Sequence, residues 1–224
     1  MKSNVLKGLL CKDVLMLKSY RKSLFMFLLI FILVSIVQKS FFAILPIMMV
    51  LGFGMTALAT FSYDEQAKSD KFMLTLPLTK KDMVLSKYIL TILFTLFGAV
   101  IGIVLTIILN LVMTQSMGNI GEIISIAIGT WFGIALVEGT QIPAIYKWGA
   151  ERGRMQIFII FAVVALAIGG IAFLLQAAHI NLAAINLAIE KWVILGEILM
   201  LALTFILYYV SYRISCHIYL KKEL

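Results

Sequence analysis

The chain is poor in the residues that hold small soluble folds together and that carry most catalytic chemistry. Its 224 residues include 2 cysteines, 3 prolines and 2 histidines, and 13% of residues are charged against 62% hydrophobic. So few polar residues cannot cover the surface of a soluble globule of this size. The composition therefore predicts an all-α integral membrane protein, with residues 1–224 forming one transmembrane domain.

The scarce cysteines and histidines exclude a disulfide framework and predict no metal site. Cys11 and Cys216 have neither a C-x-x-C partner nor a histidine at ligand spacing. No H-E-x-x-H or G-x-S-x-G motif occurs, and no carboxylate pair stands at helical spacing inside an apolar segment. We therefore expect no catalytic residues, and we do not expect an enzyme.

The chain also lacks the G-x-x-x-x-G-K-[ST] loop that holds nucleotide phosphates. No cofactor is expected on this chain, and any ATP and Mg²⁺ would be bound by a partner. The net charge of +8 does not require nucleic acid as a partner. Basic residues beside membrane spans are attracted to the anionic lipid of the inner leaflet, and membrane lipid is the partner that they predict.

Six apolar segments are long enough to consider as membrane spans. A spanning helix needs about 20 apolar residues. The segments are 23–38, 41–62, 84–113, 122–145, 156–176 and 192–212. The first is short, so it is either a tilted span or half of a re-entrant hairpin, and six crossings is the preferred count.

The basic residues fix the orientation. Of the 19 Lys and Arg residues, 17 lie in alternate gaps between the apolar segments, and only Lys39 and Lys191 lie in the others. Basic loops are retained in the cytoplasm. This pattern predicts a multi-pass protein of the cell membrane with both termini cytoplasmic. The final Lys-Lys-Glu-Leu also has the form of a eukaryotic retrieval tag, but lysines beside a membrane exit more often anchor topology.

Two further segments have defined expectations. Residues 1–22 repeat apolar residues at three- and four-residue intervals between lysines, which predicts an interfacial helix. A plain extension of the first span is the alternative. Residues 177–191 are too polar to span and too apolar to be fully solvated, so we expect a short helix or re-entrant element at the outer surface.

Residues 64–88 are expected to form a helix, a break and a second helix. Pro77 ends the first helix, and Thr79 is an N-cap with Asp82 three residues on. The second helix would run from Lys80 to Met113, or about 51 Å, so its first turns stand outside the bilayer. A short charged helix over 64–78 would then be held off the membrane, suited to docking a soluble partner; a solvated loop is the alternative.

Within the spans, a few side chains are candidates for a substrate pathway. A carboxylate in hydrocarbon costs several kcal/mol unless it is paired, protonated or hydrated. Glu138, near Gln141, could line a cavity, carry a proton or pair with a basic residue of the inner face. Met48, Met49 and Met55 are either an adaptable cargo lining or ordinary packing. Gly98-x-x-x-Gly102 and Gly129-x-x-x-Gly133 predict close helix approach.

Two spans followed by Asp64-Glu65 and by Lys71-Phe-Met-Leu-Thr-Leu-Pro-Leu-Thr-Lys-Lys-Asp-Met-Val-Leu-Ser-Lys-Tyr88 resemble permease subunits of bacterial ABC transporters of the type-2 exporter class. The resemblance is closest to the compact branch that includes exporters of phenol-soluble modulins and other amphipathic peptides, and self-immunity permeases. It implies a permease in the bacterial cell membrane, working with two cytoplasmic ATPase subunits and a second permease chain, identical or homologous.

In that family the segment between spans two and three is the coupling helix that docks on the ATPase. Carried over to this chain, the docking residues are Asp64, Glu65, Lys68, Lys71, Phe72, Met73 and Leu76, with Pro77 and Thr79 shaping the segment and Arg152 and Arg154 as a second contact. For the two arginines, topology anchoring is the alternative role.

Two other functions remain open from the sequence. One is an ion-coupled secondary carrier centred on Glu138, which the absence of an evident inverted repeat disfavours. The other is a non-transporting protein of immunity to peptide antibiotics. The substrate is not fixed by any motif; amphipathic or hydrophobic peptides follow from the family resemblance.

Overall fold

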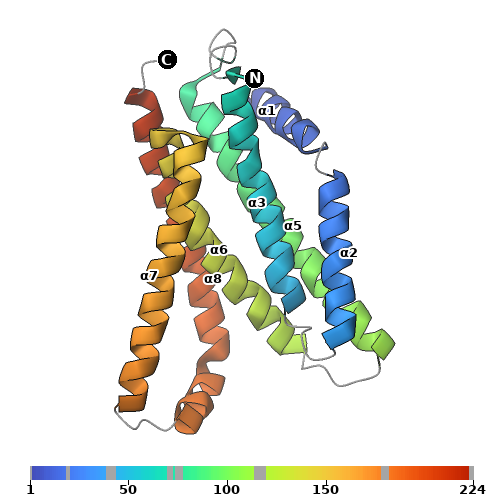
Figure 1. Ribbon diagram of the computed structural model, residues 1–224. Coiled ribbons are helices and arrows are strands. Elements are labelled where there is room, and N and C mark those ends of the chain that lie inside the picture. The colour runs from blue at the N-terminus through green and yellow to red at the C-terminus, as the bar shows by residue number, and fades with distance from the viewer. Residues whose placement is uncertain are drawn as a thin grey trace.

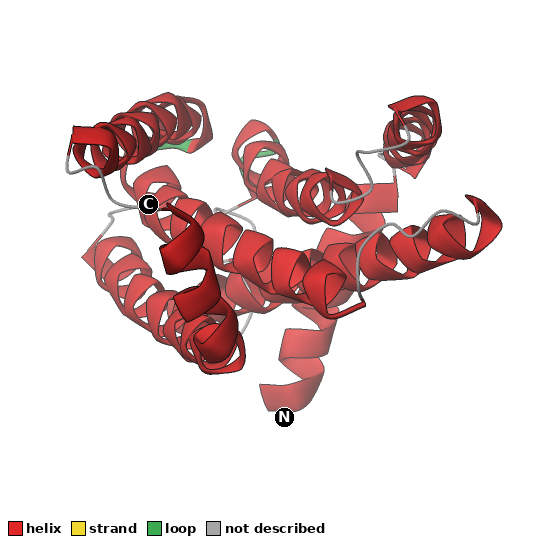
Figure 2. Ribbon diagram, turned by 90° about the horizontal axis from the view of Figure 1, so that it is seen from below, coloured by secondary structure: helices red, strands yellow, loops and turns green. Residues whose placement is uncertain are grey.

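The computed structural model describes residues 2–18, 21–38, 44–69, 73, 78–113, 120–177 and 182–221. Every secondary-structure element in these ranges is a helix (Figures 1 and 2). The helices are α1 (Lys2–Leu17), α2 (Arg21–Gln38), α3 (Ile44–Gln66), α5 (Lys80–Met113), α6 (Ile120–Trp148), α7 (Ala150–Ala177) and α8 (Leu182–Lys221). The all-α prediction is confirmed for this part of the chain.

Four helices in the described ranges are long and apolar enough to cross a membrane. They are α3, most of α5, α6, and α8 from Trp192 onward. Leu6–Leu17 and Arg21–Ile36, bent by 64°, would add a fifth if the pair is counted as one broken span. The six expected segments fall largely within α2, α3, α5, α6, α7 and α8, but six crossings remain a prediction.

Helices α3, α5, α6 and α8 pack on one another at the centre, and α2 lies against α3 on one side of the bundle while α7 lies against α6 on the other (Figure 1). The N-terminal helix α1, the last turns of α8, the end of α3, the start of α5 and the junction of α6 and α7 all lie at one end (Figure 1). This is the end that holds most of the Lys and Arg residues, and we call it the basic end.

The close approach of α3 and α5 depends on Gly98 and Gly102, one of the two glycine pairs at which the sequence predicted close helix approach. A Cβ on Gly98 would lie 2.8 Å from the carbonyl oxygen of Met49, and one on Gly102 would lie 2.7 Å from Cα of Pro46. At Gly129 and Gly133 nothing described lies within 4 Å of such a Cβ. Among the described residues, only the first pair therefore marks a helix contact.

The N-terminal helix α1 combines packing with exposed apolar surface. Leu9, Asp13 and Leu17, spaced four residues apart, are buried against the bundle, whereas Val14 and Leu15 are 49% and 62% exposed. Residues spaced by four lie on one helix face. The exposed apolar side chains fit the membrane surface expected for this segment, and the opposite face is a fixed part of the protein.

The segment expected to be an outer element is divided between two regions. Residues 182–191 form the first turns of α8, which continues to Lys221. Residues 178–181 lie outside the described residues. The described part of this segment is thus joined to the last helix.

Candidate functional site

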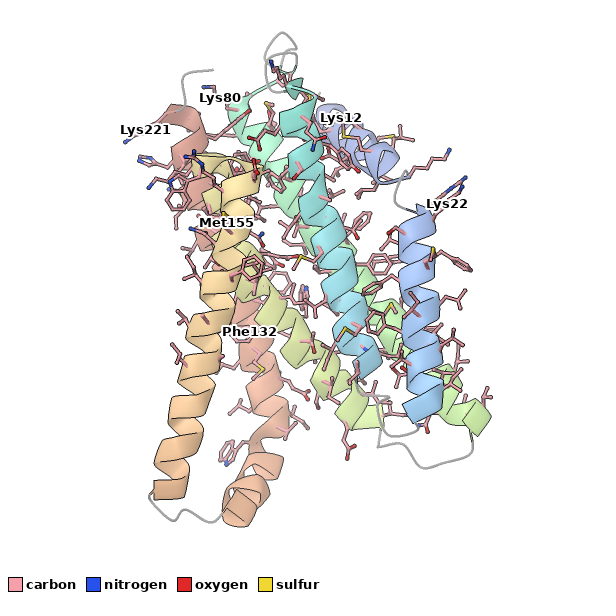
Figure 3. All side chains as sticks on the ribbon, viewed as in Figure 1. Lys12, Lys22, Lys80, Phe132, Met155 and Lys221 are labelled. Atoms are coloured by element: carbon pink, nitrogen blue, oxygen red, sulfur yellow. The ribbon has the colours of Figure 1, made fainter. Side chains whose placement is uncertain are left out.

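A cluster of four charged side chains joins three helices at the basic end. Lys12 and Asp13 come from α1, Asp64 from α3 and Lys87 from α5, and we call these four residues the charged cluster (Figure 3 labels Lys12). Lys87 Nζ lies 2.9 Å from Asp13 Oδ1 and 2.5 Å from Asp64 Oδ2. Lys12 Nζ lies 2.8 Å from Asp64 Oδ1 and 3.4 Å from Asp13 Oδ1.

The cluster is largely removed from water. Asp13 is 1% exposed and Lys87 is 7% exposed, and the Lys87 ammonium lies 5.3 Å from the centre of the Phe61 ring. A buried charge is tolerated when it is paired and hydrogen-bonded, and each carboxylate here has a lysine partner. Two lysines facing two aspartates cancel in charge, so the cluster ties α1, α3 and α5 together without a net charge.

A cavity of about 100 Å³ lies beside the cluster. Its walls include Asp13, Asp64, Glu65, Ser69 and Met73. No group of three or more metal-ligating side chains occurs among the described residues. Lys12 and Lys87, which pair with the two aspartates, also line this cavity.

The end of α3 differs from the sequence interpretation. Asp64 and Glu65 were expected to begin a separate short helix, but α3 continues through Gln66. The chain then turns, with Lys68 at φ 48° and its amide donating to the Glu65 carbonyl at 3.1 Å. A residue in the left-handed conformation just after a helix is a common way to end it. Asp64 and Glu65 thus belong to the last turn of α3.

Glu65 links α3 to α7. Its Oε2 accepts a hydrogen bond from the Ala150 amide at 2.5 Å, at the first residue of α7. Gly149 separates α6 from α7 with φ 89°, and a Cβ there would lie 2.7 Å from Glu65 Oε1. A carboxylate at a helix N-terminus satisfies an unpaired amide and complements the helix dipole. Both the backbone conformation and the limited space favour glycine at 149.

The start of α5 is capped as the sequence predicted. The Asp82 amide donates to Thr79 Oγ1 at 3.2 Å, and the Thr79 amide donates to Asp82 Oδ2 at 3.3 Å. The Thr79 hydroxyl also donates to Asp82 Oδ2 at 2.5 Å. This is a reciprocal capping box with Asp in the usual place of Glu. Both the helix start and the 34-residue length of α5 are confirmed.

The other expected docking residues lie in different environments. Lys68, Thr79 and Arg152 are exposed, whereas Met73 is buried in the hydrophobic cluster of the basic end that also includes Met83 and Tyr219. The remaining positions are Lys71, Phe72, Leu76 and Pro77, which lie outside the described residues, and Arg154, whose side chain does. The docking role of the whole set stays a prediction.

Glu138 lies in a second buried polar group, in the middle of the bundle. It is 1% exposed, and its Oε2 accepts a hydrogen bond from the Tyr208 hydroxyl at 2.6 Å. Its partner is a tyrosine of α8, whereas pairing with a basic residue of the inner face was one of the alternatives that the sequence left open. Oε1 has no hydrogen-bond partner among the described residues and faces Gly54, where a Cβ would lie 2.6 Å away.

Neighbouring polar residues extend this group. Gln141, one turn further along α6, is 2% exposed and its Oε1 also lacks a hydrogen-bond partner in the described part of the chain. Trp131 donates its indole N–H to Thr95 Oγ1 at 3.0 Å. Helices α5, α6 and α8 are thus joined by polar contacts within the apolar region.

The three methionines of the second expected span separate into two environments. Met49 is 1% exposed and packs against the glycine face of α5. Met48 and Met55 line an apolar groove between α2 and α3.

The residues that sequence reasoning missed are Lys12, Asp13 and Lys87 as a linked set, and Tyr88. The Tyr88 hydroxyl lies 2.5 Å from Ser211 Oγ and 2.8 Å from Ser215 Oγ, and Ser211 donates to the Gly139 carbonyl. One signal was available for the cluster: Asp13 falls on the same helix face as Leu9 and Leu17.

These observations define the class of protein: a helical membrane protein with several candidate spans, in which a charged cluster joins three helices at the basic end. Comparison with protein families identifies the family. The model of the ABC-2 family transporter protein matches residues 8–220, and the chain belongs to this family. It is thus an ABC transporter permease, a membrane subunit. No curated protein and no solved structure matches the chain.

Proposed function

We propose that this chain is the permease of an ATP-driven exporter that moves amphipathic or hydrophobic peptides out of a bacterial cell. ATP and Mg²⁺ are bound and used by two separate cytoplasmic ATPase subunits, and a second permease chain, identical or homologous, completes the transporter. The family match over residues 8–220 is the observation that carries the proposal. The missing phosphate-binding loop agrees with a separate energy source.

The ATPase docks at the basic end, on the segment that joins α3 to α5. Supporting this, the segment is anchored at both ends: Asp64 pairs with Lys87 across the two helices, and Thr79 caps α5. A loop that transmits force needs fixed ends, because a loosely held loop would absorb the movement of the ATPase. The excess of basic residues at this end favours the cytoplasm.

The roles of the docking residues divide by their surroundings. Asp64 and Glu65 hold the frame, because their carboxylates are engaged with α1, α5 and α7. Lys68 is exposed, and with Lys71, Phe72 and Leu76 it meets the ATPase. Met73 supports the segment from inside, given its burial in the core of the basic end. Arg152, exposed in the first turn of α7, forms a second contact.

Co-purification tests the docking proposal. The chain is co-expressed with the ABC ATPase encoded beside it, and Lys68→Glu and Phe72→Asp are compared with Arg213→Glu, an exposed charge reversal on α8. We expect the first two variants to lose the ATPase and the control to retain it, with all three eluting normally in size-exclusion chromatography. An ATPase that stays bound to both Lys68→Glu and Phe72→Asp would contradict the proposal.

One observation favours a second candidate, an ion-coupled carrier. Glu138 is buried with one carboxyl oxygen lacking a hydrogen-bond partner in the described chain, as in a group that takes up and releases a proton. Glu138→Gln keeps an acceptor for Tyr208 but removes the titratable group. An ATP-driven permease retains ATP-dependent peptide transport in this variant, whereas a carrier loses gradient-driven transport. Transport into inverted vesicles, with ATP or with a proton gradient alone, distinguishes the two.

A further inference from the structure

A long apolar groove runs between α2 and α3. Its lining is provided by Ser23, Leu24, Phe27, Met48, Leu51, Gly52, Met55, Thr56 and Ala59. The two helices touch at Gly52, where an added Cβ would lie 2.6 Å from the Phe27 ring. The Thr56 hydroxyl donates to the Gly52 carbonyl at 2.6 Å, so this polar group is already satisfied and the wall it forms is effectively apolar.

The groove is long enough for extended hydrocarbon chains. Along α3 it extends from Met48 to Ala59, which is about 16 Å at the rise of an α-helix. Its volume is about 380 Å³. Extended hydrocarbon chains can lie along the apolar walls of such a groove.

The end of the groove is positively charged. Ser23 lines the groove at the basic end. Three exposed basic residues precede Ser23 in the sequence: Lys18, Arg21 and Lys22 (Figure 3 labels Lys22 at this end of α2). The ion pairs found in the described residues do not involve these three side chains. The sequence of α2 contains no acidic residue. An occupant with an anionic head and apolar chains matches both parts of the groove.

We propose that this groove is a binding site for an anionic phospholipid of the leaflet at the basic end. Its acyl chains lie along Phe27, Met48 and Met55, and its phosphate is bound by Arg21 and Lys22. A lipid held here fills the space between α2 and α3 and sets how closely α2 packs on the bundle. The site needs only that the chain spans a membrane, and it does not depend on the exporter function.

Native mass spectrometry of the full chain tests the site. Purified protein is delipidated in mild detergent and titrated with phosphatidylglycerol or phosphatidylcholine. We expect one phosphatidylglycerol retained per chain and much weaker retention of phosphatidylcholine. Arg21→Ala with Lys22→Ala weakens binding roughly thirtyfold, the effect expected for two basic residues beside an anionic surface. Arg213→Ala with Lys221→Ala removes the same charge at the same end and leaves binding unchanged.

A second pair of variants tests the apolar part. Met55→Trp fills the groove and abolishes retention, whereas Leu93→Trp, at a 54% exposed position on α5, leaves it unchanged. The proposal is overturned if the two double alanine variants lose phosphatidylglycerol equally, or if the protein retains both lipids alike. Either result would mean that lipid is held by general attraction to the surface and not by this groove. A dimer of the chain that Met55→Trp dissociates overturns it too, because the occupant is then a second copy.

Discussion

Lys87 on α5 and Asp13 on α1 form a buried ion pair, with 2.9 Å between Nζ and Oδ1 across 74 positions of sequence. The pair attaches the N-terminal helix to the helix that leads out of the proposed docking segment. Because Lys87 also contacts Asp64, one ammonium group joins three helices. The position of α1 is therefore defined by charge as well as by the burial of Leu9 and Leu17.

Removing one member of this pair should be costly. Lys87→Met keeps the apolar stem but leaves Asp13 buried without its closest cation, and breaking a buried pair in this way costs about 3–5 kcal/mol. We expect a clear fall in the melting temperature of the detergent-purified protein. The double variant Asp13→Asn with Lys87→Met should recover part of the loss, because no unpaired charge remains. A double variant no more stable than Lys87→Met alone would contradict the coupling.

Gly149→Ala should destabilise the junction of α6 and α7. A side chain at φ 89° is strained, and its Cβ would press on Glu65 Oε1, so the expected cost is about 1–3 kcal/mol. Gly129→Ala is the matched control, since no described atom lies near its Cβ, and alanine in a helix is favoured over glycine by about 1 kcal/mol. Thermal unfolding of both variants gives the comparison. Equal melting temperatures would remove the argument for strain at Gly149.

Thr79→Ala should loosen the first turn of α5. The reciprocal bonds with Asp82 are lost, and an N-cap of this kind contributes about 1 kcal/mol. Hydrogen exchange of the amides of residues 80–83 should become faster. Thr140→Ala serves as control, because the Thr140 hydroxyl bonds only carbonyls of its own helix turn and no helix end depends on it. Unchanged exchange in Thr79→Ala would show that the cap is not needed.

Gly54→Ala tests the tight space around Glu138. The added Cβ would lie 2.6 Å from Glu138 Oε1 and 3.2 Å from Thr95 Cγ2, so α3 and α6 must separate or the carboxyl group must turn. Overpacking of a core typically costs about 1–3 kcal/mol. Gly133→Ala, with nothing described within 4 Å of its Cβ, should have no such cost. The melting temperatures of the two variants are compared with that of the unmodified protein. An unchanged melting temperature in Gly54→Ala would show that the space around Glu138 is less tight than the structure indicates.

Features that depend on nearby residues could be predicted from the sequence. The Thr79 and Asp82 cap, the extent of α5 and the close approach at Gly98 and Gly102 each follow from spacing within one helix. The end of α3 was harder to predict from the sequence. The helix continues through Asp64 and Glu65, whereas a break before these residues was expected. Their carboxylates find partners on α1, α5 and α7, and these contacts stabilise a last turn that local pattern alone does not reveal.

The charged cluster could not be predicted, for a related reason. Lys12, Lys87 and Asp64 each look like ordinary charges near a membrane surface, and nothing in a single sequence pairs residues 52 or 74 positions apart. Asp13 interrupts an apolar helix face, which signals a buried partner but does not name it. For Glu138 the burial was foreseeable, whereas its pairing with Tyr208 required the packing of α6 on α8.

The bond from Glu65 to the Ala150 amide has a mechanical consequence. It fastens the end of α3 to the start of α7, beside the contact between the Phe61 ring of α3 and the Tyr146 ring of α6. We expect a displacement of the turn after α3 to be passed on to the start of α7 through this bond. Loss of the Glu65 carboxylate would weaken that coupling.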